Sequence, residues 1–214
     1  MRDPGRMIRN LIRGVPGDYV WNYRSLMRQS QPSHLQQHAL HGALSSARMG
    51  PYLLAASNNR KLALDLYLWN IDVAGAFYEV ISIAEVVMRN AMHDQLTQKY
   101  GSHWFSDQRL FDERTTQQLI SGWRQLKLRP PIPVQQLPPG AFVSVLSFGV
   151  WVSLLDAGGW RGKEPFRERR DYDVLLWRPC LYRAFPNGPG TRKSVFALAR
   201  QVQILRNRMG LLHV

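Results

Sequence analysis

RKLALDLYLWNIDVAGAFYEVISIAEVVMRNAMHDQLTQKY, residues 60–100, is the segment that decides the fold. Its apolar side chains recur every three or four residues over many turns, a spacing that places them on one face of an α-helix. They are Leu64, Tyr67, Ile71, Ala74, Tyr78, Ile81, Met88, Met92 and Leu96. Gly101 follows directly, and a glycine at that point is a typical helix end. The sequence therefore predicts one long helix over about 60–100.

One carboxylate lies within this apolar face. Glu85 stands inside the stripe, and Arg89 follows it at i+4, the favoured orientation for an ion pair on a helix. Because a buried carboxylate needs a partner, we expect Glu85, Arg89 and Asn90 to form a supporting polar node. Its expected role is to pack against the C-terminal helix and to orient Arg206. The alternative is a direct catalytic role for Glu85.

The other periodic segments also favour helices. We expect them over about 45–56, 112–126, 141–155, 172–185 and 191–211. Gly149 falls in the middle of one of them, where a glycine costs about 1 kcal/mol relative to alanine, so a close helix crossing is expected there. Residues 156–170 are expected to form a loop. Because neither strand-like alternation nor a Gly-rich phosphate loop occurs, the sequence predicts an all-α bundle.

The first 44 residues differ from the rest. They are rich in proline, glycine and polar side chains and show little sustained periodicity. A poorly ordered extension over 1–44 and one helical domain over 45–214 are therefore predicted. In the extension, His34, His38 and His41 would share a helix face, but no carboxylate or thiolate stands near them. We expect neither a metal nor a cofactor.

Charge is the strongest feature of the composition. Lys and Arg number 28 against 15 Asp and Glu. Arginine forks bind phosphates bidentately, so this excess favours a nucleic-acid partner over a membrane; the alternative is that it only maintains solubility. The candidate nucleic-acid-binding residues surround one tryptophan in the expected loop. They are Trp160, Arg161, Lys163, Arg167, Arg169 and Arg170. Trp160 would stack a base, or it would simply anchor a surface loop.

Three features bear on the compartment. No stretch of about 18 uncharged apolar residues occurs, which argues against a membrane span. The first residues lack the apolar core of a secretory signal. The single cysteine, Cys180, excludes an internal disulfide framework. A cytoplasmic protein is expected.

A second group of polar residues stands near the end of the chain. Arg206, Asn207 and Arg208 close the last helical pattern, and His213 follows. Histidine can move protons and arginine can neutralise a phosphorane, which together suffice for metal-independent cleavage of RNA when the ribose 2'-hydroxyl is the nucleophile. The alternative is that the arginines only complement the negative end of the helix dipole.

Five short segments carry a resemblance to a known family. They are 69–70 (WN), 83–91 (IAEVVMRNA), 99–105 (KYGSHWF), 145–151 (VLSFGVW) and 205–208 (LRNR). In this order, over about 44–208, they resemble the Abi-like (AbiD/AbiF-type) abortive-infection family of bacteria, which is similar to the HEPN superfamily of small helical domains. The resemblance implies a HEPN-like helical bundle, a homodimer and a metal-independent endoribonuclease of phage defence or a toxin–antitoxin system, with RNA as substrate and an antitoxin as a further partner.

The chain departs from the family after residue 208. Family members continue toward two histidines, a glutamate and a proline, whereas Leu211 and Leu212 stand where the histidines are expected. His213 keeps an Arg-x6-His spacing from Arg206 and an Arg-x4-His spacing from Arg208. Three interpretations stay open: an active enzyme with a displaced motif, a degenerate member that only binds RNA or a protein, and a copy whose C-terminus has been altered.

Overall fold

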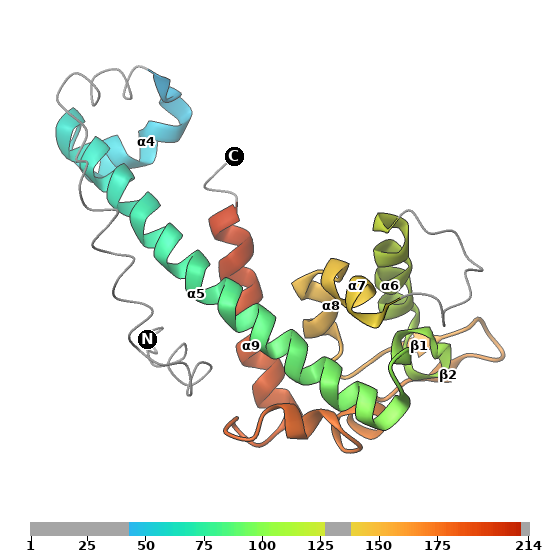
Figure 1. Ribbon diagram of the computed structural model, residues 1–214. Helices are drawn as coiled ribbons and strands as arrows, with labels where there is room; N and C mark the ends of the chain where they lie inside the picture. Colours follow the sequence, from blue (N-terminus) through green and yellow to red (C-terminus); the bar gives the residue numbers. More distant parts are fainter. Residues whose placement is uncertain (1–42, 127–137, 211–214) are drawn as a thin grey trace. The chain divides into compact units, whose positions relative to one another are not determined.

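The computed structural model describes residues 43–126 and 138–210, which fall into two units, 43–80 and 81–210 (Figure 1). Both units are mainly helical, which confirms the predicted all-α class. No described helix is long and apolar enough to cross a membrane. The extension with its three histidines, and His213, lie outside the described residues.

In the first unit a short helix packs on the start of the long one. Helix α4 (Ser46–Ala55) begins at Ser45, whose side chain accepts a hydrogen bond from a main-chain N–H of its first turn. It ends at a turn in which Ser57 and Asn58 have φ of 50° and 64°. The core between the helices is apolar, and its buried members are Met49, Ala56, Ala63, Leu64 and Tyr67. Residues 57–59 thus form the turn between α4 and the long helix.

The long helix α5 spans Arg60–Tyr100 and belongs to both units. It ends where predicted, because Gly101 takes φ of 86°, a conformation that favours glycine. Most of the predicted apolar stripe is buried. Tyr78 is an exception, since 46% of its side chain is exposed.

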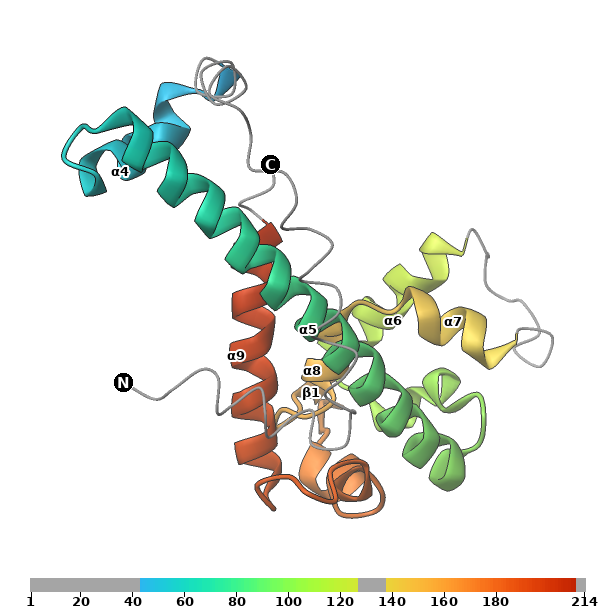
Figure 2. The ribbon, with the colours of Figure 1, turned by 60° about the vertical axis from the view of Figure 1, so that its left-hand side comes forward.

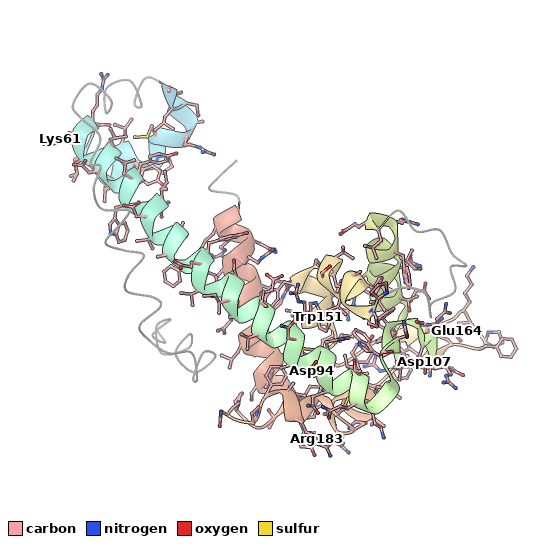
Figure 3. All side chains as sticks on the ribbon, in the orientation of Figure 1. Lys61, Asp94, Asp107, Trp151, Glu164 and Arg183 are labelled. Carbon is pink, nitrogen blue, oxygen red and sulfur yellow. The ribbon has the colours of Figure 1, made fainter. Side chains whose placement is uncertain are left out.

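The second unit gathers shorter elements around the later turns of α5 (Figures 1 and 2). They are η1 (Trp104–Ser106), η2 (Gln108–Leu110), α6 (Glu113–Gln125), α7 (Pro139–Val145), α8 (Phe148–Ser153) and α9 (Arg192–Gly210). Aromatic rings fill the core between them: the ring centroids of Phe105 and Phe142 lie 4.3 Å apart, and those of Trp104 and Trp151 lie 5.8 Å apart (Figure 3). Edge-to-face and tilted ring pairs of this kind stabilise a core beyond the area they bury.

Three predicted elements were wrong in detail. The helix expected over 141–155 is broken at Leu146 and Ser147, which are extended, with ψ of 126° and 155°. The helix expected over 172–185 is replaced by two short turns, η4 (Asp173–Trp177), which is π-helical, and η5 (Leu181–Ala184). The expected loop 156–170 contains an antiparallel hairpin of β1 (Trp160–Arg161) and β2 (Glu168–Arg169). The helices expected over 112–126 and 191–211 correspond to α6 and α9.

Candidate functional site

An ion pair joins α5 to α9. Glu85 Oε2 lies 3.2 Å from Arg206 Nε, and the two side chains are 17% and 37% exposed. Glu85 is therefore largely shielded, while Arg206 keeps a solvent-facing part. The pair joins the predicted polar node to the C-terminal helix at Arg206, which is the contact that the sequence analysis expected of the node.

The partner predicted for Glu85 was wrong. Arg89 lies one turn further along α5, but in the part of the chain that the structure describes Glu85 pairs with Arg206 instead. Arg89 Nε is buried without a hydrogen-bond partner among those residues. Such an atom costs free energy in a folded protein unless water or a ligand satisfies it. Asn90, Asn207 and Arg208 have exposed side chains.

Helix α8 meets α9 one turn before Arg206. A Cβ added at Gly149 would lie 2.9 Å from Gln203 Nε2, so the start of α8 approaches that side chain closely. Gln203 precedes Arg206 by three residues, which places both within one turn of α9. The close helix crossing predicted at Gly149 is confirmed. Parts of three sequence segments, 83–91, 145–151 and 205–208, thus meet along α9.

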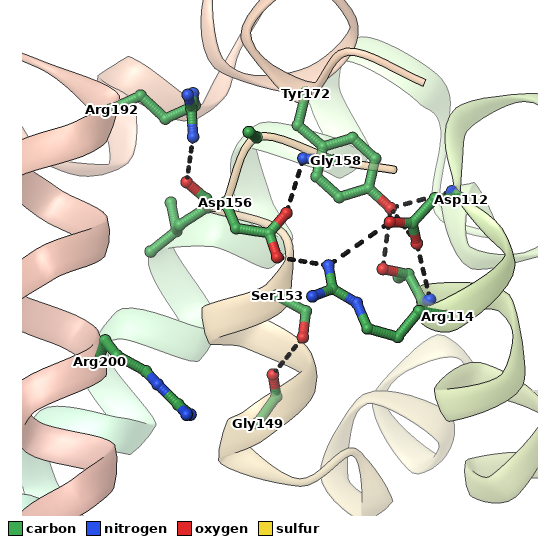
Figure 4. Close-up of polar contacts among 12 residues, drawn as sticks. Asp112, Arg114, Gly149, Ser153, Asp156, Gly158, Tyr172, Arg192 and Arg200 are labelled. Carbon is green, nitrogen blue, oxygen red and sulfur yellow. Dashed lines mark hydrogen bonds and ion pairs between the residues drawn. The ribbon is translucent and has the colours of Figure 1, made fainter. Parts of the chain in front are cut away.

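A buried polar cluster escaped the sequence analysis. The hydroxyl of Tyr172 donates to Asp112 Oδ1 at 3.0 Å and accepts from the Asp112 main-chain N–H at 3.0 Å (Figure 4). It also lies 2.8 Å from Thr115 Oγ1. Asp112 Oδ1 in turn accepts from the Thr115 N–H at 2.8 Å and so caps α6. Burial raises the pKa of Tyr172 well above its usual range, so this hydroxyl is neutral. The cluster holds the start of α6 to the chain that enters η4.

Arg114 extends this cluster toward α8. Its guanidinium pairs with Asp156 and lies 3.5 Å from Asp112 Oδ2 (Figure 4). Asp156 Oδ1 accepts from the Gly158 N–H at 2.7 Å. The two carboxylates are thereby compensated by one guanidinium and by main-chain donors. We assign this cluster a structural role.

Two glycines are required beside the cluster. Gly158 has φ of 69°, and a Cβ there would lie 2.0 Å from the Arg170 carbonyl oxygen. A Cβ at Gly159 would lie 2.6 Å from Asp112 Oδ2. Neither position has room for a side chain, so the backbone just before β1 requires glycine at both positions.

The base of the β1–β2 hairpin is tied to the body of its unit. Arg161 donates to the main-chain carbonyls of Gln108 and Phe111 and to the side chains of Gln108 and Thr116. Arg170, at the other strand end, pairs with Glu168 and is 19% exposed. Two of the predicted nucleic-acid-binding residues, Arg161 and Arg170, are thus engaged in contacts within the protein.

Other side chains of the hairpin are exposed, both in its turn and on its strands. Phe166 is 85% exposed, the highest value for a large apolar side chain in the described ranges. Trp160 is 46% exposed, and the guanidinium carbons of Arg167 and Arg169 lie 4.8 Å and 5.8 Å from its ring centroid. Lys163 is exposed as well. The four remaining predicted binding residues are therefore exposed on the same hairpin as Phe166, which the sequence analysis did not single out.

A cavity of about 370 Å³ lies at the start of α9 and borders the hairpin through Arg169. Its other charged lining residues are Asp171, Asp173, Arg192 and Lys193. Arg192 Nε lies 3.5 Å from Asp173 Oδ1, and Arg192 Nη1 donates to the Leu155 carbonyl at 2.9 Å. Cations and anions thus face one another across this cavity. Within the described residues, no group of three or more His, Cys, Asp or Glu side chains is arranged to hold a metal ion.

Comparisons with known proteins returned no match: no family model fits the chain, and neither a curated protein nor a solved structure is similar to it. The resemblance to the Abi-like family stays a prediction. Any function assigned to the site must follow from the residues of this chain.

Proposed function

We propose that this protein is a metal-independent endoribonuclease of the HEPN type that serves bacterial phage defence or acts as a toxin. The observation that carries the proposal is the ion pair of Glu85 with Arg206, which holds a partly exposed guanidinium at the junction of α5 and α9. An arginine that is already held in place can neutralise the negative charge that develops on a phosphorane, because no free energy is spent on moving its side chain during the reaction.

The proposed reaction needs no group beyond side chains and the RNA itself. The ribose 2'-hydroxyl attacks the adjacent phosphorus, the bond to the 5'-oxygen breaks, and the products carry a 2',3'-cyclic phosphate and a 5'-hydroxyl. In this proposal His213 removes or supplies the proton. Arg206 and Arg208 bind and stabilise the phosphate, and Asn207 orients the reacting groups.

A homodimer is part of the proposal. A spacing of seven residues, as between Arg206 and His213, would correspond to about 10 Å along a helix axis, farther than one phosphate spans. Pairing of two copies would bring the arginines of one to the histidine of the other, as the resemblance to HEPN domains implies. An antitoxin that blocks the site is a further proposed partner.

The test is incubation of the purified protein with total RNA in EDTA, followed by analysis of the product ends for 2',3'-cyclic phosphate. Cleavage is expected for the wild type, and loss of about a hundredfold or more for Arg206→Ala and His213→Ala. Arg60→Ala removes the same charge from an exposed position in the other unit and is the matched control. Unchanged cleavage in both site variants would remove the proposed site.

The second candidate is a binding module without catalytic activity. The observation that favours it is that Glu85 already compensates Arg206, so this guanidinium serves to hold α5 and α9 together. Such a protein would bind RNA, or a protein partner, through its basic surface. Strongly salt-dependent RNA binding without cleavage products would establish this candidate in place of the enzyme.

A further inference from the structure

The β1–β2 hairpin combines an exposed aromatic ring with exposed cations. Phe166 is 85% exposed, although a phenyl ring gains free energy from being covered. A single exposed ring is common on protein surfaces, but this one lies on a loop among basic residues, and exposed loops often carry binding contacts. The hairpin 160–170 carries five basic and two acidic residues. A ligand that covers Phe166 therefore lies among basic side chains, which favours a negatively charged ligand.

Each cation of the hairpin has a different surrounding. Arg161 and Arg170 point into the protein contacts described above and do not face the tip. Arg167 and Arg169 lie over the Trp160 ring instead. Arg169 Nη2 donates to the Ala157 carbonyl at 3.2 Å, and Arg167 Nη1 is 3.8 Å from Glu164 Oε1, a distance too long for a strong pair.

The contacts of Trp160 favour a role other than the base stacking that the sequence analysis considered for it. Cation–π contacts hold guanidinium groups near an indole ring, so Trp160 positions Arg167 and Arg169. The ring that is free to stack on a ligand is Phe166. Lys163 follows Gly162 in the turn, three residues after β1 begins at Trp160, and adds a third exposed cation.

We propose that the β1–β2 hairpin is a binding arm for single-stranded RNA, in which Phe166 stacks on a base while Lys163, Arg167 and Arg169 contact the neighbouring phosphates. Aromatic rings interleaved with cations suit single strands, because unpaired bases offer a π-face and the backbone offers regular negative charge. A duplex hides its base faces and would leave Phe166 uncovered. This inference rests on the proposed action on RNA and names the strand state that the protein selects.

The arm lies at the opposite end of α9 from the candidate cleavage site. Arg169 borders the cavity with Arg192 and Lys193 at the start of α9, and Arg206 is fourteen residues further along the helix. That separation is about 21 Å at the rise of an α-helix. A strand held at the arm must extend over several nucleotides to reach Arg206, so short oligonucleotides are expected to bind at the arm without being cleaved.

The test measures binding separately from cleavage. The probe is a fluorescein-labelled oligouridine with 2'-O-methyl riboses, which lacks the nucleophile for cleavage, and the readout is fluorescence anisotropy of the full chain over a series of salt concentrations. Phe166→Ala and Phe166→Leu are expected to weaken binding about tenfold or more, and Phe166→Tyr to retain it, because only the aromatic variant can stack. Arg167→Ala is expected to reduce the slope of log K against log salt by about 0.7.

Two control variants match these changes. Trp69→Ala removes another exposed aromatic ring, which is 63% exposed in the first unit, and Arg60→Ala removes another exposed charge. Both are expected to bind like the wild type. A duplex of the same length is expected to compete poorly with the single strand.

Several outcomes would overturn the inference. Wild-type affinity in Phe166→Ala, or in Phe166→Leu, excludes stacking at the tip, and equal competition by the duplex excludes selection of single strands. Absence of binding by the wild type at low salt excludes the arm altogether and leaves a protein partner as the occupant. The cleavage assay with Arg206→Ala tests the proposed function independently. RNA could be cleaved at the α5–α9 site without binding to the hairpin, and it could bind to the hairpin without being cleaved.

Discussion

Glu85 and Arg206 lie 121 positions apart in the chain, yet their side chains meet at 3.2 Å where α5 crosses α9. Because Arg206 is 37% exposed, solvent screens the pair and limits what it adds to stability. The pair serves mainly to fix the direction of the Arg206 side chain.

The first prediction concerns this ion pair. A double-mutant cycle with Glu85→Gln and Arg206→Gln is expected to give a coupling energy in the free energy of unfolding of about 1 kcal/mol or less. Denaturant unfolding of the four proteins measures it. Under the proposed function, Glu85→Gln also lowers the rate of RNA cleavage with the fold intact, since the guanidinium loses its support. A cleavage rate unchanged in Glu85→Gln would mean that Arg206 needs no positioning.

The second prediction concerns the buried hydroxyl of Tyr172. Tyr172→Phe keeps the ring and removes the partner of the Asp112 N–H and carboxylate, so the free energy of unfolding is expected to fall by about 1–3 kcal/mol. Chemical denaturation measures the change. Tyr182→Phe is the control: this residue is 45% exposed and its hydroxyl accepts from Arg183 at the surface, so the change is expected to be less than about 0.5 kcal/mol. Equal effects of the two variants would contradict a structural role for the cluster.

The third prediction contrasts two glycines. Gly158→Ala is expected to destabilise the protein by well over 1 kcal/mol, because the residue has positive φ and its Cβ would collide with the Arg170 carbonyl. Gly75→Ala, inside α5 with nothing near the added Cβ, is expected to stabilise it by about 0.5–1 kcal/mol. Thermal unfolding of both variants gives the signs. Two shifts in the same direction would be inconsistent with the backbone described here.

The fourth prediction concerns pH. His93 Nδ1 accepts from Trp104 Nε1 at 3.0 Å, and burial lowers the pKa of His93 below its usual 6.5. The unfolded chain therefore takes up a proton at a higher pH than the folded protein does. The contribution of His93 to stability is complete above pH 6.5 and is lost as the pH falls from there through the folded-state pKa.

Unfolding measured at pH 7.5 and at pH 5.5 checks this expectation. His93→Asn keeps an acceptor near the indole N–H but does not titrate, so its stability is expected to fall less than that of the wild type between the two pH values. His103→Asn serves as the comparison for another histidine of the same unit. If His93→Asn and the wild type lose the same stability, the lowered pKa of the half-buried His93 is refuted.

Local patterns in the sequence predicted the long elements well. The apolar periodicity of 60–100 and the glycine that follows define α5, because a helix of this length must bury one face over many turns. Asp112 was placed correctly at the start of α6, where its carboxylate caps the helix. In each case the deciding interactions lie within a few residues of one another.

Elements set by distant contacts could not be predicted in this way. The segment 141–155 carries apolar side chains throughout, and its break places Leu146 against Gly122, where an added Cβ would lie 2.9 Å from Leu146 Cδ2. Tyr172 meets Asp112 across 60 positions, with no local pattern to mark it.

The candidate site divides in the same way. The sequence identified the chemistry of Glu85 and Arg206 but chose the partner of Glu85 by the i+4 rule, which covers only one helix. It found the basic residues of the hairpin but could not separate Arg161, which is held inside, from Arg167 and Arg169, which face outward. Phenylalanine is usually a core residue, so Phe166 could be recognised as a surface residue only from its 85% exposure in the structure.

Arg161 anchors the hairpin to residues about 50 positions earlier. The turn beyond it, from Gly162 to Arg167, is held by contacts within the hairpin, such as the Phe166 N–H bond to the Lys163 carbonyl and the Arg167 guanidinium over the Trp160 ring. The strands held by Arg161 and the turn 162–167 are thus stabilised by different contacts. Substitution of Arg161 is expected to lower the stability of the fold, while substitutions in the turn 162–167 are expected to change mainly the chemistry of the surface. If the hairpin is the proposed binding arm, a handful of positions in its turn would set the ligand preference and could change without rebuilding the core.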